Sequence, residues 1–351
     1  MTASDSPKQS STRRRRPQPS RLLTLAVALP TLGLIAATLF GFLGSFAWWL
    51  DLFAHFRPHY VMAAAAVGLV GLLTRRWVWA GLAWVVVPIN LLLFIGLIRT
   101  SPYTLTPGFP ELELLHINVL TSNVHHDLVA DYVREVEPAF LFLQETDDRW
   151  VAEMQQRLPN YDLLVTAPRG DNFGVAAFAR RPLPDRFTLQ SSGIVDLDPP
   201  TGLPAAEVRF RIDQTDLAIL SLHPPPPMGE HKSRVRNRML AAAGEWSNRQ
   251  DRPHIVVGDL NATPWCAPIR QLRRDTGLDH ARDGQSLQNS WPTFLPGFVR
   301  IPIDLCLLSP GWRVTRCQTG PDVGSDHLPL VIALEPPIPP RPPAPATIGA
   351  S

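Results

Sequence analysis

The chain has 351 residues, enough for more than one domain, with 33 basic and 31 acidic side chains and a formal net charge of +2. Residues 1–99 hold ten basic and two acidic side chains, which leaves 23 basic and 29 acidic ones, a net charge of about −6, in residues 100–351. An acidic C-terminal region lacks the overall positive charge that is typical of a nucleic-acid-binding protein. A local basic patch within it is the alternative. Three scattered cysteines show no zinc-ligand spacing. We expect them to be buried apolar residues, with a disulfide between two of them as the alternative: Cys266, Cys306 and Cys317.

The N-terminal third of the chain is dominated by apolar segments. Residues 1–20 are polar, rich in Ser, Pro and Arg, and are expected to be disordered. Uncharged apolar segments follow at 22–50, 60–74 and 77–98. About 20 apolar residues span a bilayer, a length that the first and third segments reach and the second does not. We therefore predict a membrane region at 21–99 with about three transmembrane helices.

Other interpretations of these segments stay open. They could form a buried helical hairpin in a soluble core. The first could be a secretory signal peptide with Arg13–Arg16 as its charged region, but its apolar run is longer than a signal core. A transporter or channel is disfavoured, because the apolar segments carry no ionisable residue in their interiors.

The basic residues predict an orientation in the membrane. Arg13–Arg16 and Arg21 precede the first segment, and Arg75 and Arg76 lie between the second and third. Lys and Arg favour the cytoplasmic side, so three crossings would place everything after Arg99 outside the cytoplasm. If the second segment enters the membrane without crossing it, the soluble part lies outside the cytoplasm only when the number of other crossings is odd.

The rest of the chain reads as one soluble domain between flexible segments. We predict a linker at 100–110, a domain at 111–335 and an extended Pro-rich tail at 336–351. Many short apolar runs with a few helical patterns indicate two packed sheets flanked by helices. Strands are predicted at 112–117, 139–143, 174–179, 206–212, 217–222, 255–257, 303–308 and 328–334, and helices at 127–137, 236–249 and 268–276.

Polar side chains follow several of these strands at the point where each ends. Asp259 and Asn261 follow the run 254–257 and, being two residues apart, point to the same side. Their oxygens could face one metal ion, or a phosphate and its attacking water. The alternative is a polar turn that caps the strand. Gly324-Ser325-Asp326-His327 forms a second such tip, and the remaining strand-end residues are Asn118, Gln144, Glu145, His223 and Asp304.

These motifs resemble those of the endonuclease/exonuclease/phosphatase superfamily, which includes deoxyribonuclease-like enzymes. The resemblance rests on Gly258-Asp259-Leu260-Asn261, Gly324-Ser325-Asp326-His327 and Leu143-Gln144-Glu145, and it covers about 112–334. The whole chain is most similar to bacterial membrane-anchored members. The resemblance implies an α+β fold, a four-layer α/β/β/α sandwich with two mostly antiparallel sheets, behind an N-terminal transmembrane region. It also implies hydrolysis of a phosphate ester with Mg²⁺ or Mn²⁺.

The resemblance assigns metal and water roles to five of the residues. Glu145 would be the principal metal-binding carboxylate, with Asn118 beside it and Asp326 as a second carboxylate on the metal side. Asp259 would orient or deprotonate the attacking water, and Asn261 would hold the phosphate.

It assigns proton handling to two histidines. His327 would stabilise the charged phosphate and manage a proton, with Asp304 orienting it. His223 would protonate the leaving oxygen. Asn123 and His125 are expected to be loop residues, with a role as ligands as the alternative. Arg236 and Asn237 are expected on a solvated helix face, with a position near the site as the alternative.

At three positions the sequence lacks a residue that is frequent in the family: an Asp before the strand at 139–143, a Ser at the end of the strand at 174–179, and a His after Asp304. It has Ala139, Ala179 and Leu305 at these positions, and the last change could alter substrate contacts. The sequence thus predicts a membrane-anchored, divalent-metal-dependent phosphoesterase that cleaves a phosphodiester or phosphomonoester by in-line attack of water. The alternatives are a DNA-degrading nuclease of the same fold and a catalytically silent binding or scaffold protein. Its expected partners are a lipid-linked or nucleic-acid phosphate ester and the bilayer, and no protein partner is evident.

Overall fold

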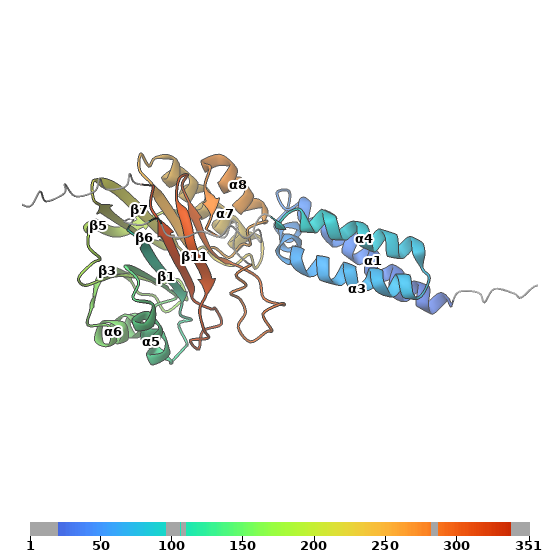
Figure 1. The fold of residues 1–351 in the computed structure, drawn as a ribbon, viewed down its shortest axis with the longest axis horizontal. Helices are drawn as coiled ribbons and strands as arrows, with labels where there is room; N and C mark the ends of the chain where they lie inside the picture. Colours follow the sequence, from blue (N-terminus) through green and yellow to red (C-terminus); the bar gives the residue numbers. More distant parts are fainter. Residues whose placement is uncertain (1–19, 96–105, 107–109, 282–286, 338–351) are drawn as a thin grey trace, which may run out of the picture.

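The computed structural model describes residues 20–95, 106, 110–281 and 287–337. A bundle of apolar helices projects from a β-rich domain (Figure 1). Most of the expected disordered N-terminus, linker and Pro-rich tail lies outside the described residues. The elements of the bundle are α1 (Arg21–Phe42), α2 (Trp48–Leu52), the 3₁₀ helix η1 (Phe53–Phe56), α3 (Arg57–Leu73) and α4 (Trp77–Leu91).

Two helical segments of the bundle are long and apolar enough to cross a membrane, within the described part of the chain. They are Arg21–Phe42, with 22 residues, and Trp48–Leu73, with 26 residues. The third apolar helix, Trp77–Leu91, has 15 residues and falls short of the usual span. By length and composition alone, two of the three predicted segments could cross a membrane.

The bundle is held together by small residues and by one buried polar cluster. A Cβ atom added at Gly71 would lie 2.9 Å from the Cβ of Ala80, so glycine lets α3 and α4 approach closely. The Arg57 guanidinium is buried and donates from Nη1 to the Thr38 carbonyl and to Asn90 Oδ1, both at 3.0 Å. Because these residues lie on α1, α3 and α4, the cluster joins all three long helices.

The β-rich domain contains two six-stranded sheets. Their strand orders are β11-β12-β1-β2-β4-β3 and β5-β6-β7-β8-β10-β9. Each sheet has one parallel pair near its centre, β1–β2 or β7–β8, and antiparallel pairs elsewhere. The strands of the first sheet are β1 (Leu112–Asn118), β2 (Phe140–Gln144), β3 (Tyr161–Ala167), β4 (Val175–Arg180), β11 (Arg313–Thr319) and β12 (Leu330–Glu335). Those of the second are β5 (Phe187–Asp196), β6 (Pro204–Ile212), β7 (Thr215–Leu222), β8 (His254–Asp259), β9 (Asp279–His280) and β10 (Asp304–Leu308).

The sheets face each other across one core, and helices cover their outer faces. Side chains alternate along β1, so that Leu114 packs between the sheets whereas Leu115 and Ile117 pack under the helices. This arrangement confirms the predicted fold of two mostly antiparallel sheets flanked by helices, and all three cysteines are buried in it. The first sheet is covered by α5 (His126–Val136) and α6 (Asp148–Arg157), and the second by α7 (Glu230–Asn248) and α8 (Ala267–Thr276).

Candidate active site

The candidate site lies where the two parallel strand pairs end. Asn118 ends β1, Glu145 directly follows β2, His223 directly follows β7 and Asp259 ends β8. The carboxyl ends of parallel strands meet at one edge of a sheet, which is where open α/β sheets bind ligands. Here the two sheets present these edges to each other, so residues 141 positions apart, Asn118 and Asp259, become hydrogen-bonded neighbours.

Two antiparallel strands bring further side chains to the same edge. Asp304 begins β10 and pairs with Asp259 in the register of the second sheet. His327 precedes β12, which runs antiparallel to β1. Six of the eight residues proposed from the sequence line one cleft of about 770 Å³, and Asn118 and Asp304 are fully buried just behind it. The six are Glu145, His223, Asp259, Asn261, Asp326 and His327.

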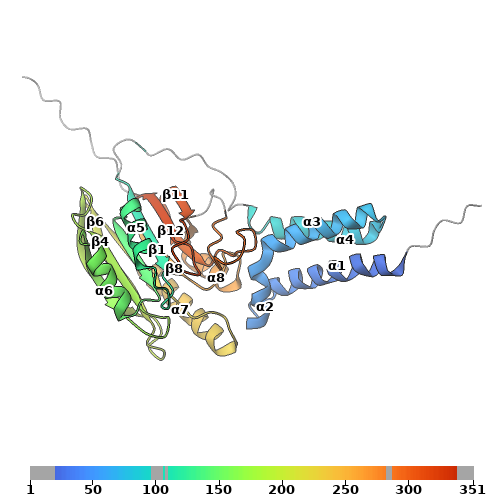
Figure 2. The same ribbon diagram turned by 90° about the horizontal axis from the view of Figure 1, so that it is seen from below.

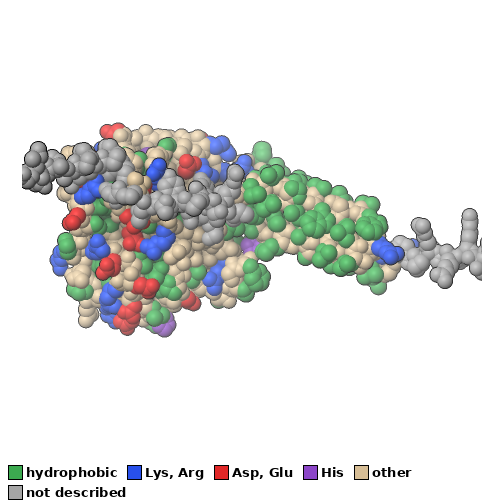
Figure 3. Space-filling view, in the orientation of Figure 1, with side chains coloured by type: hydrophobic (Ala, Val, Ile, Leu, Met, Phe, Trp, Pro, Cys, Tyr) green, Lys and Arg blue, Asp and Glu red, His purple; other side chains and the backbone are tan. Residues whose placement is uncertain are grey.

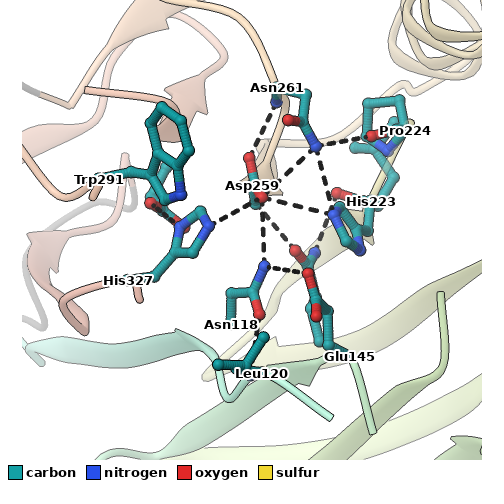
Figure 4. A network of polar contacts seen from close by, with 12 residues as sticks. Asn118, Leu120, Glu145, His223, Pro224, Asp259, Asn261, Trp291 and His327 are labelled. Atoms are coloured by element: carbon teal, nitrogen blue, oxygen red, sulfur yellow. Dashed lines mark hydrogen bonds and ion pairs between the residues drawn. The ribbon is translucent and has the colours of Figure 1, made fainter. Parts of the chain in front are cut away.

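The Asp259 carboxylate is the centre of the polar network (Figure 4). Its Oδ1 accepts the Asn261 backbone N–H at 2.9 Å, and its Oδ2 accepts from Asn118 Nδ2 at 3.2 Å. His223 Nε2 and His327 Nε2 approach the same Oδ2 at 3.4 and 3.5 Å. An anionic oxygen that faces two imidazole rings is arranged to exchange protons with a bound molecule.

The backbone around Asp259 is fixed by Gln144 and Gly258. Gln144 Oε1 accepts the Asp259 N–H at 2.9 Å, and Gln144 Nε2 donates to the Leu222 carbonyl at 2.9 Å, so one amide joins the ends of β2, β7 and β8. A Cβ atom at Gly258 would lie 2.2 Å from the Leu222 oxygen, which only glycine avoids. Sequence reasoning named Gln144 as a polar strand end but gave it no role.

Two of the site residues have left-handed backbone conformations. The φ angles of Glu145 and Asn261 are 62° and 48°. Such conformations are uncommon for residues other than glycine and concentrate at functional sites. They turn both side chains from their strands into the cleft.

His327 is held by a buried acid that also holds a second histidine. Asp304 Oδ2 lies 2.8 Å from His327 Nδ1, and Asp304 Oδ1 lies 2.9 Å from His116 Nε2. Burial alone would lower the pKa of His327, but the charges of Asp304 and Asp259 outweigh it and raise that pKa well above its usual range. Burial likewise opposes ionisation of Asp304, yet the two histidines hold its pKa far below the ordinary value. His116 was missed in the sequence because it lies within an apolar strand.

His223 is fully buried on the other side of Asp259. Burial disfavours its protonated form, but the hydrogen bond and charge of Asp259, and then the charge of Glu145, raise the pKa of this imidazole. Its Nε2 also lies 3.3 Å from Asn261 Nδ2, and its ring packs 5.3 Å from that of Phe173. The sequence motif alone did not predict the contact with Phe173.

Two carboxylate oxygens near the cleft are suited to a divalent cation. Glu145 Oε1 accepts from Asn118 at 2.9 Å, whereas Glu145 Oε2 is buried and has no partner among the described residues. Asp326 Oδ2 accepts from Trp291 Nε1 at 3.0 Å, and its Oδ1 is likewise buried without a partner there. Desolvation raises the pKa of Glu145, which reflects how costly its negative charge is without a counter-ion. Paired carboxylate and amide oxygens are the ligands that Mg²⁺ prefers.

The favoured prediction for Arg236, a solvated helix face, was wrong, and the alternative, a position near the site, is confirmed. Its side chain is fully buried, and Nη2 donates to Asp51 Oδ2 of α2 at 2.8 Å. Nη1 donates to the backbone carbonyl of Asn261 at 3.2 Å. One guanidinium therefore connects the helical region to the active-site loop. Arg236 and Asp51 are 185 positions apart, so no local sequence pattern predicts their contact.

The described residues contain two groups of potential metal ligands, Asp259, Asp304 and His327 in the site and a second group around Asp51. Ligand atoms of Asp51, His55 and Cys266 lie within 4.8 Å of one another. Both oxygens of Asp51 are already engaged, by Arg236 and by the Ala267 N–H at 2.9 Å. The adjacent guanidinium favours an ion pair here over a bound cation.

The residues that depart from the family pattern are buried away from the cleft. Leu305 packs in the core between the second sheet and its helices, and Ala139 and Ala179 pack between the sheets. None of the three lines the cleft. Asn123 is a buried loop residue whose side chain donates to the carbonyls of Val119 and Val323.

Comparisons with known proteins agree with this geometry. The model of the endonuclease/exonuclease/phosphatase family matches residues 115–327. No curated protein sequence matches the chain. Similar solved structures include an endonuclease/exonuclease/phosphatase from Bacteroides vulgatus, with 18% identity over 65% of this chain and 99% of that chain and a TM-score of 0.54. TDP2 from D. rerio, in complex with a single-strand DNA product, has 18% identity over 64% and 98% of the two chains and a TM-score of 0.53. The catalytic domain of human Nocturnin, with a bound sulfate anion, has 20% identity over 64% and 94% and a TM-score of 0.51.

Identities this low establish the shared fold and nothing finer. The family match is stronger evidence, because it covers more than half of the chain and includes both strand-tip motifs. Members of this family are hydrolases that act on phosphoester bonds. The chain therefore belongs to the endonuclease/exonuclease/phosphatase family.

Proposed function

We propose that the protein is a membrane-anchored, divalent-metal-dependent phosphoesterase that hydrolyses its substrate by in-line attack of water. The observation that carries this proposal is the convergence at one cleft of Asp259, two histidines and two carboxylates with unpartnered oxygens. This combination offers a base, proton donors and a cation site within one space. A catalytically silent binding protein would have no need to keep all of them.

Asp259 would act on the water and Asn261 on the phosphate. A backbone N–H fixes Oδ1 of Asp259. Its Oδ2, which accepts from Asn118 and faces both histidines, would orient the attacking water or take its proton. The Asn261 side chain donates to the Pro224 carbonyl at 3.0 Å, which orients its amide at the cleft. Holding both reactants in place reduces the entropic part of the barrier.

The two histidines would handle protons and negative charge. Asp304 fixes the His327 ring through Nδ1, so that Nε2 points to Asp259 and the cleft. The raised pKa of His327 favours its cationic form, which would stabilise the charge on the phosphate. His223, whose pKa is also raised, would donate a proton to the leaving oxygen.

Glu145 and Asp326, with Asn118 beside Glu145, would hold the divalent cation. When bound, Mg²⁺ or Mn²⁺ would offset the negative charge of the phosphate as a Lewis acid. Magnesium binding can be measured by calorimetry on the full-length protein. We expect binding that Glu145→Ala abolishes.

The activity is tested on the full-length protein in detergent with a panel of phosphate esters. The panel contains bis(p-nitrophenyl) phosphate, p-nitrophenyl phosphate, plasmid DNA and phospholipid, each with Mg²⁺ and with a chelator. We expect chelator-sensitive hydrolysis of at least one ester. A folded sample that hydrolyses none of them would reject the proposal, and preferential cutting of plasmid DNA would favour the nuclease alternative.

We also propose that residues 21–99 anchor the domain at 111–335 outside the cytoplasm. The basic residues at the end of the bundle far from the β-rich domain support this orientation (Figure 3). Arg76 donates to the Ser20 carbonyl at 3.3 Å, which places the α3–α4 turn beside the start of α1 at that end. Exposed aromatic side chains lie toward both ends of the bundle, Trp49 near the domain and Trp77 far from it, as in interfacial belts.

Protease protection in sealed vesicles tests the orientation. We expect the catalytic domain to be cleaved when the outer surface is exposed to protease, whereas a tag placed before α1 is protected. The reverse pattern would reject the proposed orientation without affecting the proposed activity.

A further inference from the structure

The active-site cleft has a second wall that comes from the helical region. Trp48 and Leu52 of α2 and Phe56 of η1 line the same cleft as Asp259 and His327. Figure 2 places α2 at the base of the bundle, where it meets the β-rich domain near α7. One continuous space thus joins the polar residues of the domain to an apolar surface at the foot of the bundle.

Apolar side chains at this cleft are left exposed to solvent. Phe56 is 44% exposed, and Met228, which lines the cleft from the loop between β7 and α7, is 73% exposed. Large exposed apolar side chains that flank a cleft mark a binding surface for an apolar group. An apolar group in the cleft could therefore contact both the helical region and the domain.

A neighbouring loop extends the apolar surface along the foot of the bundle. Phe294 and Phe298 are 76% and 67% exposed. The loop is tied to the start of α3, because His59 Nε2 donates to the Val299 carbonyl at 2.9 Å. These side chains therefore lie on the part of the domain next to the apolar helices, where a bilayer would be in reach.

The apolar wall also contains one polar group without a partner. His55 is buried and lines the cleft, and neither of its ring nitrogens has a hydrogen-bond partner among the described residues. Buried polar atoms are normally satisfied, so this imidazole is available to a water molecule or to a polar atom of a ligand. A ligand with polar oxygens next to a hydrocarbon chain meets this requirement.

The charge of the cleft does not suit a nucleic-acid strand. Among the described residues that line it, Lys232 is the one Lys or Arg, and Asp171 adds a negative charge. Binding of a nucleic-acid strand relies on a row of basic contacts to successive phosphates. A single phosphate group requires far less positive charge.

We propose that the cleft binds a membrane amphiphile of the phospholipid class, with its phosphate at Asp259 and His327 and its hydrocarbon chain between Phe56 and Met228. The inference rests on the proposed phosphoesterase function and names the substrate class of that site. The helical region then does more than tether the domain, because it supplies one wall of the substrate site.

The test varies the chain length of the substrate while the phosphate chemistry stays constant. Full-length protein in dodecyl maltoside micelles is assayed with Mg²⁺ on phosphatidic acid and phosphatidylglycerol, each with two butanoyl or two octanoyl chains. For the ester class that is hydrolysed, we expect kcat/KM to rise about tenfold or more from butanoyl to octanoyl chains. Equal values for the two chain lengths would overturn the inference, as would faster hydrolysis of single-stranded DNA than of the octanoyl ester.

Variants locate the chain-length preference in the cleft. Phe56→Ser and Met228→Ser should each lower the octanoyl-to-butanoyl ratio of kcat/KM by about tenfold, because each removes apolar contact area from the chain. Leu128→Ser is the matched control, since Leu128 is an exposed leucine of α5 outside the cleft. If all three variants change the ratio equally, the proposed location of the chain is wrong.

Two further measurements separate this inference from the proposed function. Hydrolysis of bis(p-nitrophenyl) phosphate without any preference for octanoyl chains would overturn the inference and leave the proposed function in place. If no ester is hydrolysed, the proposed function fails, and equilibrium binding of dioctanoyl phosphatidic acid still decides the inference. Binding that Phe56→Ser weakens about tenfold and Leu128→Ser leaves unchanged supports it, and equal affinities overturn it.

Discussion

The helical region and the β-rich domain use their apolar residues in opposite ways. In the bundle, large apolar side chains such as Leu32, Leu69 and Trp77 face outward, and a polar cluster around Arg57 lies inside. In the domain, apolar side chains fill three layers of core, and charged residues of both signs cover the outside (Figure 3). This contrast is what the proposed membrane anchor requires, because an apolar outer surface suits hydrocarbon and a charged one suits water.

The contact between the two regions follows neither pattern. It combines the buried ion pair of Asp51 and Arg236 with an aromatic contact between Phe94 and Trp265, whose rings lie 5.9 Å apart. Ala54 and Phe94 belong to the same apolar cluster as the helices on the second sheet. The bundle thus continues the core of the domain, which a flexible tether would not do.

The largest expected effect concerns the polar interior of the domain. Asp259→Asn should lower phosphoesterase activity by about 10³-fold, because the amide cannot accept a proton from water and cannot stabilise two cationic histidines. The measurement is kcat/KM for whichever ester of the panel is hydrolysed. Asp251→Asn is the matched control, since Asp251 lies before the same strand with a side chain that is 84% exposed. Activity of Asp259→Asn within tenfold of the native protein would contradict the proposed role.

The next effect tests whether the bundle is part of the folded domain. Asp51→Leu leaves the Arg236 guanidinium buried without its carboxylate, which typically costs about 3–5 kcal/mol. Urea unfolding in detergent, monitored by a probe in the domain, measures the loss. Activity should fall too, because Arg236 holds the Asn261 carbonyl.

A double variant and a surface pair provide the controls for that experiment. Asp51→Leu combined with Arg236→Met removes both charges and should recover much of the lost stability. Glu245→Gln breaks an exposed pair with Arg249 on the same helix and should cost less than about 1 kcal/mol. An equal, small loss for Asp51→Leu and Glu245→Gln would show that the two regions fold independently.

The third effect separates the surroundings of the two regions. Leu32→Asp places a charge near the middle of α1, where insertion into a membrane should become less favourable by about 3 kcal/mol. Leu128→Asp, on the water-facing side of α5, should leave membrane association unchanged. Fractionation of membranes after carbonate extraction measures both. If Leu32→Asp stays fully in the membrane fraction, α1 does not face lipid at this position.

Strand prediction from the sequence succeeded at the centre of each sheet and failed at the edges. All eight predicted strands are interior, and the four that were missed, β3, β5, β9 and β11, are the four edge strands. Interior strands are buried on both faces and appear as continuous apolar runs. Edge strand Phe187–Asp196 is mostly exposed, so its sequence contains Ser, Gln and Gly and shows no apolar pattern.

The candidate site could be predicted only where its residues lie at the ends of recognisable strands. Asp259 and His327 have such local motifs, and the structure brings them within 3.5 Å of each other. No local motif marks His116, Trp291 or Asp51, because each gains its role from a partner that is distant in the sequence. His116, for example, contacts Asp304, which lies 188 positions away. Pairings of this kind depend on how the sheets and helices pack, which no local pattern records.

The smallest expected effect compares two Arg–Asp pairs of the same helix. Arg238 of α7 binds Asp198 through two hydrogen bonds of 3.0 and 2.9 Å, but its side chain is 50% exposed, unlike that of Arg236. These hydrogen bonds hold the pKa of Asp198 below its usual value. Because the folded-state pKa is lowered, the pair stabilises the protein above the unfolded-state pKa of about 3.9, and this stability is lost as the pH falls toward the folded-state pKa.

Asp198→Asn should therefore cost about 0.5–1 kcal/mol at pH 7, and the difference from the native protein should shrink below pH 4 in urea unfolding. A difference that stays constant with pH would mean that Asp198 contributes through packing, and that the contrast between the buried and the half-exposed pair is not electrostatic.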